Sequence, residues 1–579
     1  MKRETYCGAA WGKRCLTLCV FLLTASLAFG GSSKLSKDLQ NLPSGQSANV
    51  IVQYYKTPTT TDTSAATSAG ATKLKKLGSF KGHGYSMSPA AAAKLASLNT
   101  NVKYISPDRP LKGAMNFAVP AVNADLAHNL GYDGTGVGVA VIDSGVNSVA
   151  DLGVSGSSSS RVVYSENFDP SGNTTSDLYG HGTHVAGIIA GNGSNSSCLS
   201  CDVTFRGIAP NVNIINLRAL DQNGSATDST VIAAIQQAIA LQSQYNIRII
   251  NLSLGRGVFE SYTTDPLCQA VEQAWNAGIV VVVAAGNYGR DNSNNNIGYG
   301  TITAPGNDPY VITVGAMKTM GTATRADDLI ATYSSKGPTM LDHVVKPDLV
   351  APGNLIISDL ASTSDTMYSL YPANLVPVSY YTTHNTTKIS SHYYQLSGTS
   401  MAAPMVSGAA ALLLQQNPAL TPDQVKARLM KTAYKTFPTS SSYTEPSTGI
   451  TYTDYYDIFT VGAGYLDTAA ALSNTDVAPP TSGSALSPTA VYDSTTGNVD
   501  LVNGSSVVWG TSVVWGTSVV WGTSVVWGTN TSGQSVLSGN SVVWGTSTSS
   551  AFSVVWGSSV VWGAKTNSDA MTIAVGGEK

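Results

Sequence analysis

Short apolar runs alternate with helical segments over the long central part of the chain, from about residue 119 to residue 474. Such alternation is typical of a parallel sheet with helices on both faces, so it predicts an α/β fold with a mostly parallel β-sheet. A segment of roughly 350 residues is ample for one large core. The expected strands span residues 137–143, 212–219, 247–254, 280–285 and 311–316, and the expected helices span 229–244, 266–277 and the segment opened by Thr421-Pro422-Asp423.

A serine stands where a tight glycine turn leads into a helix of small residues, in Ser397-Gly398-Thr399-Ser400-Met401-Ala402-Ala403-Pro404. Unpaired N–H groups and a partial positive charge at a helix N-terminus allow the Ser400 N–H to stabilise a developing oxyanion while its hydroxyl attacks. Serine is also a preferred N-cap, so this motif by itself fits a purely structural role as well.

Two further segments supply what a nucleophilic serine needs. His181 begins His181-Gly182-Thr183-His184-Val185-Ala186-Gly187, again a glycine turn that opens a helix, and Asp143 ends the apolar run 137–143. An acid at the carboxyl end of a parallel strand lies in the crevice where open sheets place their chemistry. A serine hydroxyl requires a base within reach and a carboxylate to orient that base. Ser400, His181 and Asp143 are therefore predicted to be nucleophile, base and orienting acid.

The order Asp, His, Ser and the residues around each resemble the subtilisin family of serine peptidases, peptidase S8. The resemblance rests on Val141-Ile142-Asp143-Ser144-Gly145 and on segments 181–187 and 397–404. It implies a subtilisin-like fold and an endopeptidase that acts on proteins or peptides through an acyl-enzyme. No cofactor is expected for catalysis. A structural calcium ion is an open expectation to which no ligand residue is assigned, so the metal ligands are unknown.

Another strand end resembles the family segment that donates to the oxyanion. The run 279–283 leads into Ala284-Ala285-Gly286-Asn287. By resemblance, the Asn287 side chain and the Ser400 N–H form the oxyanion hole. The structural alternative for Asn287 is a polar residue that caps the turn after a strand.

The resemblance also implies which residues bind substrate. Two walls of the S1 pocket and the edge that pairs with an extended substrate are expected from two groups of small residues and one glycine turn. No acidic residue falls on those walls, so apolar or aromatic P1 side chains are favoured; the floor is expected between residues 298 and 304. The expected substrate-binding residues are Ser253, Leu254, Gly255, Ala284, Ala285, Gly286, Gly224 and Ser225.

Two features near these motifs have competing interpretations. His181 and His184 have the spacing of two metal ligands on one helix face, but no Glu or third ligand follows at zinc spacing, which favours a His184 that is hydrogen-bonded inside the fold. The Tyr-rich stretch 352–397 suggests an inserted surface loop near the nucleophile. That loop either screens substrates or is a passive excursion.

The start of the chain has the pattern of a secretory signal peptide, predicted for residues 1–30. Basic residues precede the apolar stretch 15–29, which ends in small residues. That stretch is short for a membrane helix, and no later segment is apolar over the roughly 18 residues that a span requires. The sequence thus predicts an exported protein, secreted to the extracellular space, without a membrane span in the mature chain.

Residues 31–113 are expected to form a propeptide. The strand-like runs 50–55 and 102–105 flank a helical stretch, 89–98, and this unit resembles the inhibitor I9 propeptide, which implies that the chain's own propeptide inhibits the enzyme. The Ser/Thr/Ala-rich span 57–72 is expected to be an inserted loop, and residues 110–115 a processing site. The catalytic domain would then span residues 114–474.

Cysteine usage and charge narrow the class further. After removal of the signal peptide, Cys198, Cys201 and Cys268 remain; export favours a local disulfide or one that involves Cys268, with one thiol left over. Charged residues make up 12% of the chain, the formal net charge is −3, and no basic stripe is present, so nucleic acid is not an expected partner.

Residues 475–579 are predicted to be a linker and a β-rich repeat tail. Ser-Val-Val-Trp-Gly recurs there, with tryptophans at 509, 515, 521 and 527 and again at 544, 556 and 562. In an extended chain an even period places the first four on one face, and such short repeats are typical of solenoids or stacked strands. The sequence as a whole predicts a secreted, autoprocessed serine endopeptidase. The alternative is an adhesive or binding protein that uses the tail, with the catalytic domain as a scaffold. Attachment of the secreted protein to the cell surface through the tail is an open expectation.

Overall fold

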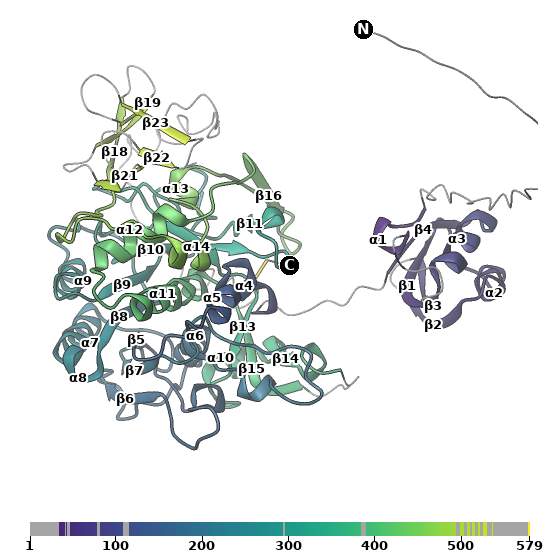
Figure 1. The fold of residues 1–579 in the computed structure, drawn as a ribbon, viewed down its shortest axis with the longest axis horizontal. Helices are drawn as coiled ribbons and strands as arrows, with labels where there is room; N and C mark the ends of the chain where they lie inside the picture. Colours follow the sequence, from purple (N-terminus) through teal and green to yellow (C-terminus); the bar gives the residue numbers. More distant parts are fainter. Residues whose placement is uncertain are drawn as a thin grey trace, which may run out of the picture. The chain divides into compact units, whose positions relative to one another are not determined.

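The structure is a computed structural model, shown as a ribbon in Figure 1. It describes residues 34–40, 42, 47–77, 81–107, 115–292, 296–383, 389–493, 498–502, 507–509, 512–515, 519–521, 525–529, 535–536 and 577–578. The predicted signal peptide, most of the processing segment 110–115, and Trp544, Trp556 and Trp562 lie outside these residues. The chain forms two compact units, residues 1–111 and 112–579.

The first unit is a four-stranded antiparallel sheet with its own hydrophobic core. The strand order is β2-β3-β1-β4. Buried side chains such as Val50, Tyr85, Leu95 and Ile105 join the sheet to its helices. The elements are α1 (Lys37–Gln40), β1 (Ala48–Tyr54), α2 (Thr60–Ser68), β2 (Thr72–Leu77), β3 (Gly82–Met87), α3 (Pro89–Leu98) and β4 (Val102–Pro107).

The expectation that residues 57–72 form an inserted loop is wrong, because this span contains helix α2. Thr59 and Asp62 form a capping box at its start, and the Asp62 carboxylate also accepts a hydrogen bond from Asn99 Nδ2 at 3.0 Å. Ala66 is fully buried in the unit's core. Threonine has weak helix propensity, so the cap and the tertiary contact decide the conformation here.

The second unit contains an eight-stranded sheet in the order β11-β10-β9-β8-β5-β7-β6, with β12 also paired to β10. All pairings are parallel except that of β10 with β11. The strands are β5 (Gly138–Asp143), β6 (Val162–Asn167), β7 (Asn213–Arg218), β8 (Ile247–Leu252), β9 (Val280–Ala284), β10 (Ile312–Lys318), β11 (Leu329–Ile330) and β12 (Leu349–Pro352). The predicted mostly parallel sheet is confirmed.

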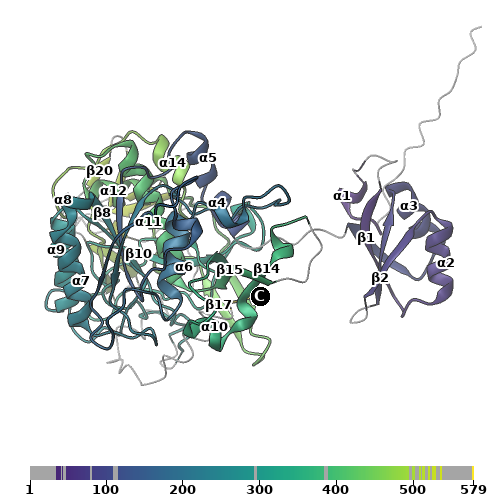
Figure 2. The same cartoon turned by 90° about the horizontal axis from the view of Figure 1, so that it is seen from below.

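Helices cover both faces of this sheet, as Figure 2 shows with α7 and α9 on one side and α6 and α11 on the other. This two-sided cover explains why strands such as β5 and β9 are buried along their whole length. The helices are α4 (Met115–Ala121), α5 (Ala124–Asn129), α6 (His181–Ala190), α7 (Asp228–Ala240), α8 (Gln242–Tyr245), α9 (Pro266–Asn276), α11 (Thr399–Gln416), α12 (Pro422–Thr432), α13 (Ile458–Val461) and α14 (Thr468–Ser473).

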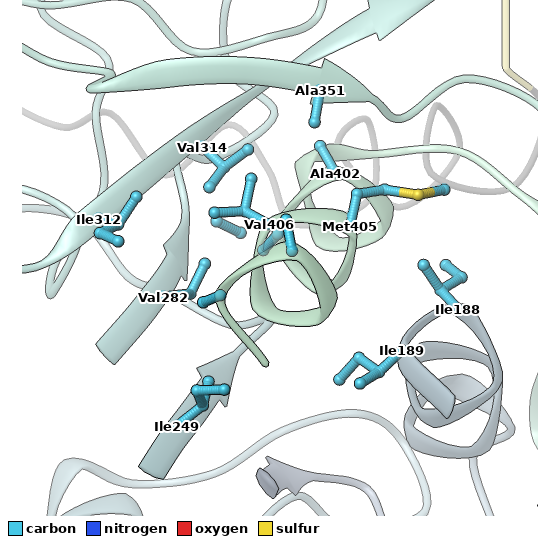
Figure 3. Packing of buried hydrophobic residues seen from close by; sticks show 14 of the residues in the cluster. Ile188, Ile189, Ile249, Val282, Ile312, Val314, Ala351, Ala402, Met405 and Val406 are labelled. Carbon is cyan, nitrogen blue, oxygen red and sulfur yellow. The ribbon is translucent and has the colours of Figure 1, made fainter. Parts of the chain in front are cut away.

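Helix α11 lies at the centre of the core. Figure 3 shows Ala402, Met405 and Val406 of α11 facing side chains of the sheet and of α6. The helix is apolar around most of its circumference, so it is buried on nearly all sides. Thr399, which begins the helix, is itself fully buried.

The Tyr-rich stretch 352–397, expected to be a surface loop, contains regular secondary structure in its described part. It forms the three-stranded sheet β13-β15-β14, made of β13 (Ile356–Asp359), β15 (Ile389–Leu396) and β14 (Leu375–Pro377), together with α10 (Thr366–Leu370). Tyr393 and Tyr394 are each 1% exposed. Their rings are part of the main core, which composition alone did not indicate.

Beyond residue 432 the chain adds a hairpin of β16 (Ser440–Thr444) and β17 (Thr451–Tyr455), and then the tail. The strands β20 (Val507–Trp509) and β21 (Ser512–Trp515) pair antiparallel, as do β22 (Val519–Trp521) and β23 (Val525–Thr529). The first four tryptophans therefore belong to four strands rather than to one extended strand. The remaining tail strands are β18 (Thr489–Asp493), β19 (Asn498–Val502) and β24 (Ser535–Val536).

Residues beyond 475 still pack against the catalytic unit. Ser487 Oγ donates to the buried Asp348 carboxylate at 2.5 Å, and the Ala490 N–H donates to the His343 carbonyl at 2.8 Å. Ala485, Ser487 and Ala490 are all buried. None of the described helices combines the length and apolar character that crossing a membrane requires.

Candidate active site

Asp143 and His181 meet where strand β5 ends and helix α6 begins. His181 Nδ1 lies 2.8 Å from Asp143 Oδ1, which also accepts the Ser144 N–H at 2.8 Å. A Cβ on Gly182 would lie 2.2 Å from the Gly145 carbonyl oxygen and 3.1 Å from Asp143 Cβ. Glycine at 182 therefore allows the helix start to approach the acid closely enough for this contact.

The surroundings of His181 favour its charged form. Burial by itself lowers the pKa of an imidazole, but the charge of Asp143 and the hydrogen bond to it outweigh burial and raise the pKa of His181 above its ordinary value. Asp143 is 1% exposed. Because Nδ1 faces this carboxylate, Nε2 is the nitrogen available to exchange a proton with Ser400 or a substrate.

Ser400 is the second residue of α11 and follows Gly398, whose φ of 143° lies in the region that favours glycine. Its hydroxyl donates to the Ser253 carbonyl at 3.2 Å, and Ser253 Oγ donates to the Ser400 carbonyl at 2.8 Å. In this structure the hydroxyl thus points to Ser253 rather than to His181. Hydrogen bonds of catalytic groups are often formed only when substrate is present.

Asn287 lies beyond the end of β9 and faces the start of α11. Its Oδ1 accepts the Thr399 N–H at 2.9 Å and the Thr399 hydroxyl at 3.2 Å. These contacts fix the amide so that Nδ2 is the donor left over, next to the main chain at Gly398. The capping alternative and the oxyanion role are compatible, because Oδ1 of Asn287 accepts from Thr399 while Nδ2 remains free to donate.

Most of the predicted substrate-binding residues line one cleft of about 440 Å³ that also contains His181, Asn287 and Ser400. Ala285 is different: it is fully buried and does not line the cleft. Its backbone carbonyl accepts the Thr303 hydroxyl at 3.3 Å. The lining residues from the predicted set are Ser253, Leu254, Gly255, Ala284, Gly286, Gly224 and Ser225.

Thr303 occupies the position between the two walls that the sequence placed only within residues 298–304. A Cβ on Gly255 would lie 2.5 Å from Thr303 Oγ1, and one on Gly286 would lie 2.8 Å from Thr303 Cγ2. Both walls therefore need glycine where they approach Thr303. The residue between the two walls is therefore small and uncharged.

The cleft also contains a charged group that sequence reasoning missed. Arg256 follows Gly255 directly and pairs with Asp228 at 2.8 Å and with Asp265 at 2.9 Å. Arg256 and Asp228 both line the cleft, as does Met367 from α10. In the sequence, only its position next to the predicted wall residue Gly255 pointed to Arg256, because its two partners lie at the starts of two different helices.

The structure distinguishes between the interpretations left open for His184 and for the cysteines. His184 Nε2 donates to the carbonyls of Ile356 and Tyr394 at 3.2 and 3.1 Å, and burial lowers the pKa of His184 to about 3. The described residues contain no group of three or more His, Cys, Asp or Glu side chains suited to a metal. Cys198 and Cys201 form a local disulfide, and Cys268 is a buried thiol.

Known proteins resemble this chain in sequence. The subtilase family model matches residues 134–464, more than half of the chain. The chain is 37% identical over 354 residues to serine protease AprX of Bacillus subtilis, covering 59% of this chain and 72% of that one. It is 35% identical over 318 residues to subtilisin DY of Bacillus licheniformis, covering 55% and 90%.

Among solved structures, a cold-adapted subtilisin-like serine proteinase is 30% identical, covers 52% of this chain and 84% of its own, and gives a TM-score of 0.37. The family match and the sequence relatives suffice for assignment: the chain belongs to the subtilase family and is a subtilisin-like serine protease.

Proposed function

We propose that this protein is a secreted serine endopeptidase that hydrolyses peptide bonds through an acyl-enzyme formed on Ser400. The observation that carries the proposal is the 2.8 Å contact of His181 Nδ1 with buried Asp143, which leaves Nε2 for the cleft that contains Ser400. Ser400 Oγ attacks the scissile carbonyl carbon, and its proton passes to His181 Nε2. This step requires the hydroxyl to rotate away from the Ser253 carbonyl.

The remaining steps use the same groups. Asn287 Nδ2 and the Ser400 N–H donate to the oxyanion, and His181 returns the proton to the leaving amine as the C–N bond breaks. Water then attacks the acyl-enzyme, with His181 again as base. Asp143 keeps the imidazole in the required tautomer. The reaction draws on groups of this chain, and we propose no cofactor for it.

Labelling with a fluorophosphonate tests this function directly. We expect covalent modification of Ser400 in the active enzyme and none in the Ser400→Ala variant, together with a loss of peptidase activity of about 10⁶-fold. Ser253→Ala is the matched control, because it removes a neighbouring hydroxyl of the cleft without removing the nucleophile. Labelling of the Ser400→Ala variant would exclude Ser400 as the nucleophile.

We further propose that residues 31–113 are an inhibitory propeptide removed by the enzyme itself. The support is the compact first unit, whose hydrophobic core is separate from that of the second. Residues 47–107 added in trans should inhibit the mature enzyme at stoichiometric levels, and Ser400→Ala should leave the precursor uncut. No inhibition at excess would reduce this segment to a spacer.

The tail repeats are proposed to serve attachment to cell surfaces or polymeric substrate, not catalysis. Truncation is a poor test, because residues 485–490 and 577–578 pack against the catalytic unit. Replacing residues 505–562 by a Gly/Ser sequence of equal length avoids this problem. We expect unchanged hydrolysis of small peptides and weaker retention on cells or insoluble protein. Loss of small-peptide activity would contradict a separate role, and unchanged retention would contradict attachment.

A further inference from the structure

A carboxylate from far along the chain is buried in the catalytic unit. Glu578 is 2% exposed, although the preceding described residues end at Val536. Its Oε2 accepts Lys318 Nζ at 2.5 Å, and its Oε1 accepts Arg290 Nη2 at 3.0 Å. Thr332 adds its N–H and hydroxyl to Oε1, at 2.8 and 2.5 Å. Both carboxylate oxygens are thus bonded inside the protein.

The backbone of Glu578 is recognised as well as its side chain. Its N–H donates to Asn354 Oδ1 at 2.9 Å, and its carbonyl accepts Asn354 Nδ2 at 2.8 Å. A side-chain amide that pairs with both main-chain groups of one residue holds a peptide segment in a fixed register. Such a contact does not depend on the carboxylate. Glu578 is therefore held in two independent ways, through its main chain and through its side chain.

The neighbouring position strongly favours glycine. Gly577 has a φ of 60°, and a Cβ there would lie 2.4 Å from Ser397 Oγ and 2.5 Å from Leu355 Cδ2. Ser397 stands three positions before the nucleophile, and the Gly398 N–H donates to the carbonyl of Gly353, next to Asn354, at 2.8 Å. The segment therefore rests against the loop that leads to Ser400.

The pocket is cationic and mostly covered, which makes an anionic occupant necessary. The side chains of Lys318 and Arg290 are 9% and 11% exposed. Lys318 Nζ lies 4.8 Å from the ring centre of Tyr443, and the Arg290 guanidinium lies 4.6 Å from that of Tyr452, both from the hairpin β16–β17. Glu445 balances one charge through Arg290 at 3.0 Å. Without Glu578 one buried cation would lack a counter-charge, which is strongly unfavourable.

We propose that Arg290, Lys318, Thr332 and Asn354 form a peptide-binding site that is specific for a Gly-Glu segment and is occupied by the chain's own Gly577–Glu578. The tail is then attached to the catalytic unit at two places, around residues 485–490 and at 577–578. A single cut in the chain between these two places then leaves the distal fragment bound.

The test uses the full-length chain in the Ser400→Ala background, so that self-digestion does not occur. A recognition sequence for a site-specific protease is inserted between residues 565 and 571, and the chain is cut after folding. We expect the fragment with residues 571–579 to co-elute with the rest of the protein. In Glu578→Gln and Gly577→Ala chains it should be lost at least tenfold faster. Lys579→Gln, a charge change at the adjacent position, should leave retention within twofold.

A second measurement needs no further substitution in the folded protein. A fluorescent peptide with the sequence of residues 571–579 should exchange into the cut, otherwise native chain, and the same peptide with Gln for Glu578 should bind at least tenfold more weakly. Loss of the native fragment at the rate of the Glu578→Gln fragment would overturn the proposal. Equal binding of the two peptides would overturn it too.

Discussion

The active-site cleft and the Glu578 pocket both contact the segment 397–400. They differ in how far their polar groups are hydrogen-bonded. In the cleft, Asn287 Nδ2 and His181 Nε2 have no partner among the described residues. In the pocket, Glu578 is bonded through both carboxylate oxygens and both main-chain groups. The free Asn287 donor beside Ser400 is available to stabilise negative charge that develops during a reaction, and the free His181 nitrogen is available to accept a proton. Fully paired groups add rigidity and stability instead.

This contrast predicts that changes in the cleft act on kcat, whereas changes in the pocket act on stability. Among variants that keep Ser400, the largest effect is expected from Asp143→Asn. Loss of the carboxylate removes the group that orients His181, so kcat should fall by about 10⁴-fold. Steady-state kinetics together with thermal unfolding measure both quantities. A loss below about 10²-fold in a folded variant would contradict the role of Asp143.

Glu578→Gln should affect stability first. Removing one partner of a buried ion pair leaves a cation without its counter-charge and typically costs about 3–5 kcal/mol in the free energy of unfolding. Glu445→Gln is the matched control: it removes another partner of Arg290, but its side chain is 24% exposed, so a loss of about 1 kcal/mol or less is expected.

Chemical denaturation of both variants measures the difference. Equal losses of unfolding free energy in Glu578→Gln and Glu445→Gln would contradict this prediction, because the buried ion pair would then contribute no more than the partly exposed one.

Asn287→Ala tests the free donor of the cleft. Removing one donor of an oxyanion hole lowers kcat by about 10²–10³-fold, and KM should change little because the donor acts mainly in the transition state. Asn287 Oδ1 also accepts from Thr399, so thermal unfolding must be measured alongside. A kcat loss below tenfold, or a loss that appears only in KM, would remove Asn287 from the oxyanion hole.

The pH profile gives the smallest effect. His181 must be neutral to accept a proton, so activity falls when the pH drops below its pKa. Burial lowers the pKa of His181, but the Asp143 charge and hydrogen bond outweigh burial and raise this pKa, so the acid limb of kcat/KM should lie at a higher pH than an ordinary imidazole would give. In Asp143→Asn the residual activity should have its acid limb at lower pH. An unchanged limb would mean that another group controls it.

Local sequence was sufficient to predict the residues of the candidate triad. The glycine turns before His181 and Ser400 and the apolar run before Asp143 each specify their geometry within a few residues, and the parallel sheet follows from the alternation of strands and helices. The site residues and fold class were therefore predicted together. Helix α2 was missed, because its stability depends on the Asp62 cap and on burial of Ala66 rather than on residues of high helix propensity.

The amino-acid sequence by itself thus determined the family, the mostly parallel sheet and the residues of the candidate triad. Tertiary structure alone placed Thr303 between the two walls, paired Arg256 with Asp228 and Asp265, buried Tyr393 and Tyr394, and brought Glu578 to Arg290 and Lys318. The physical reason is the range of the interaction. Turns, caps and strand periodicity act over a few neighbouring residues, whereas a buried charge is stabilised only by a partner that folding brings from elsewhere in the chain.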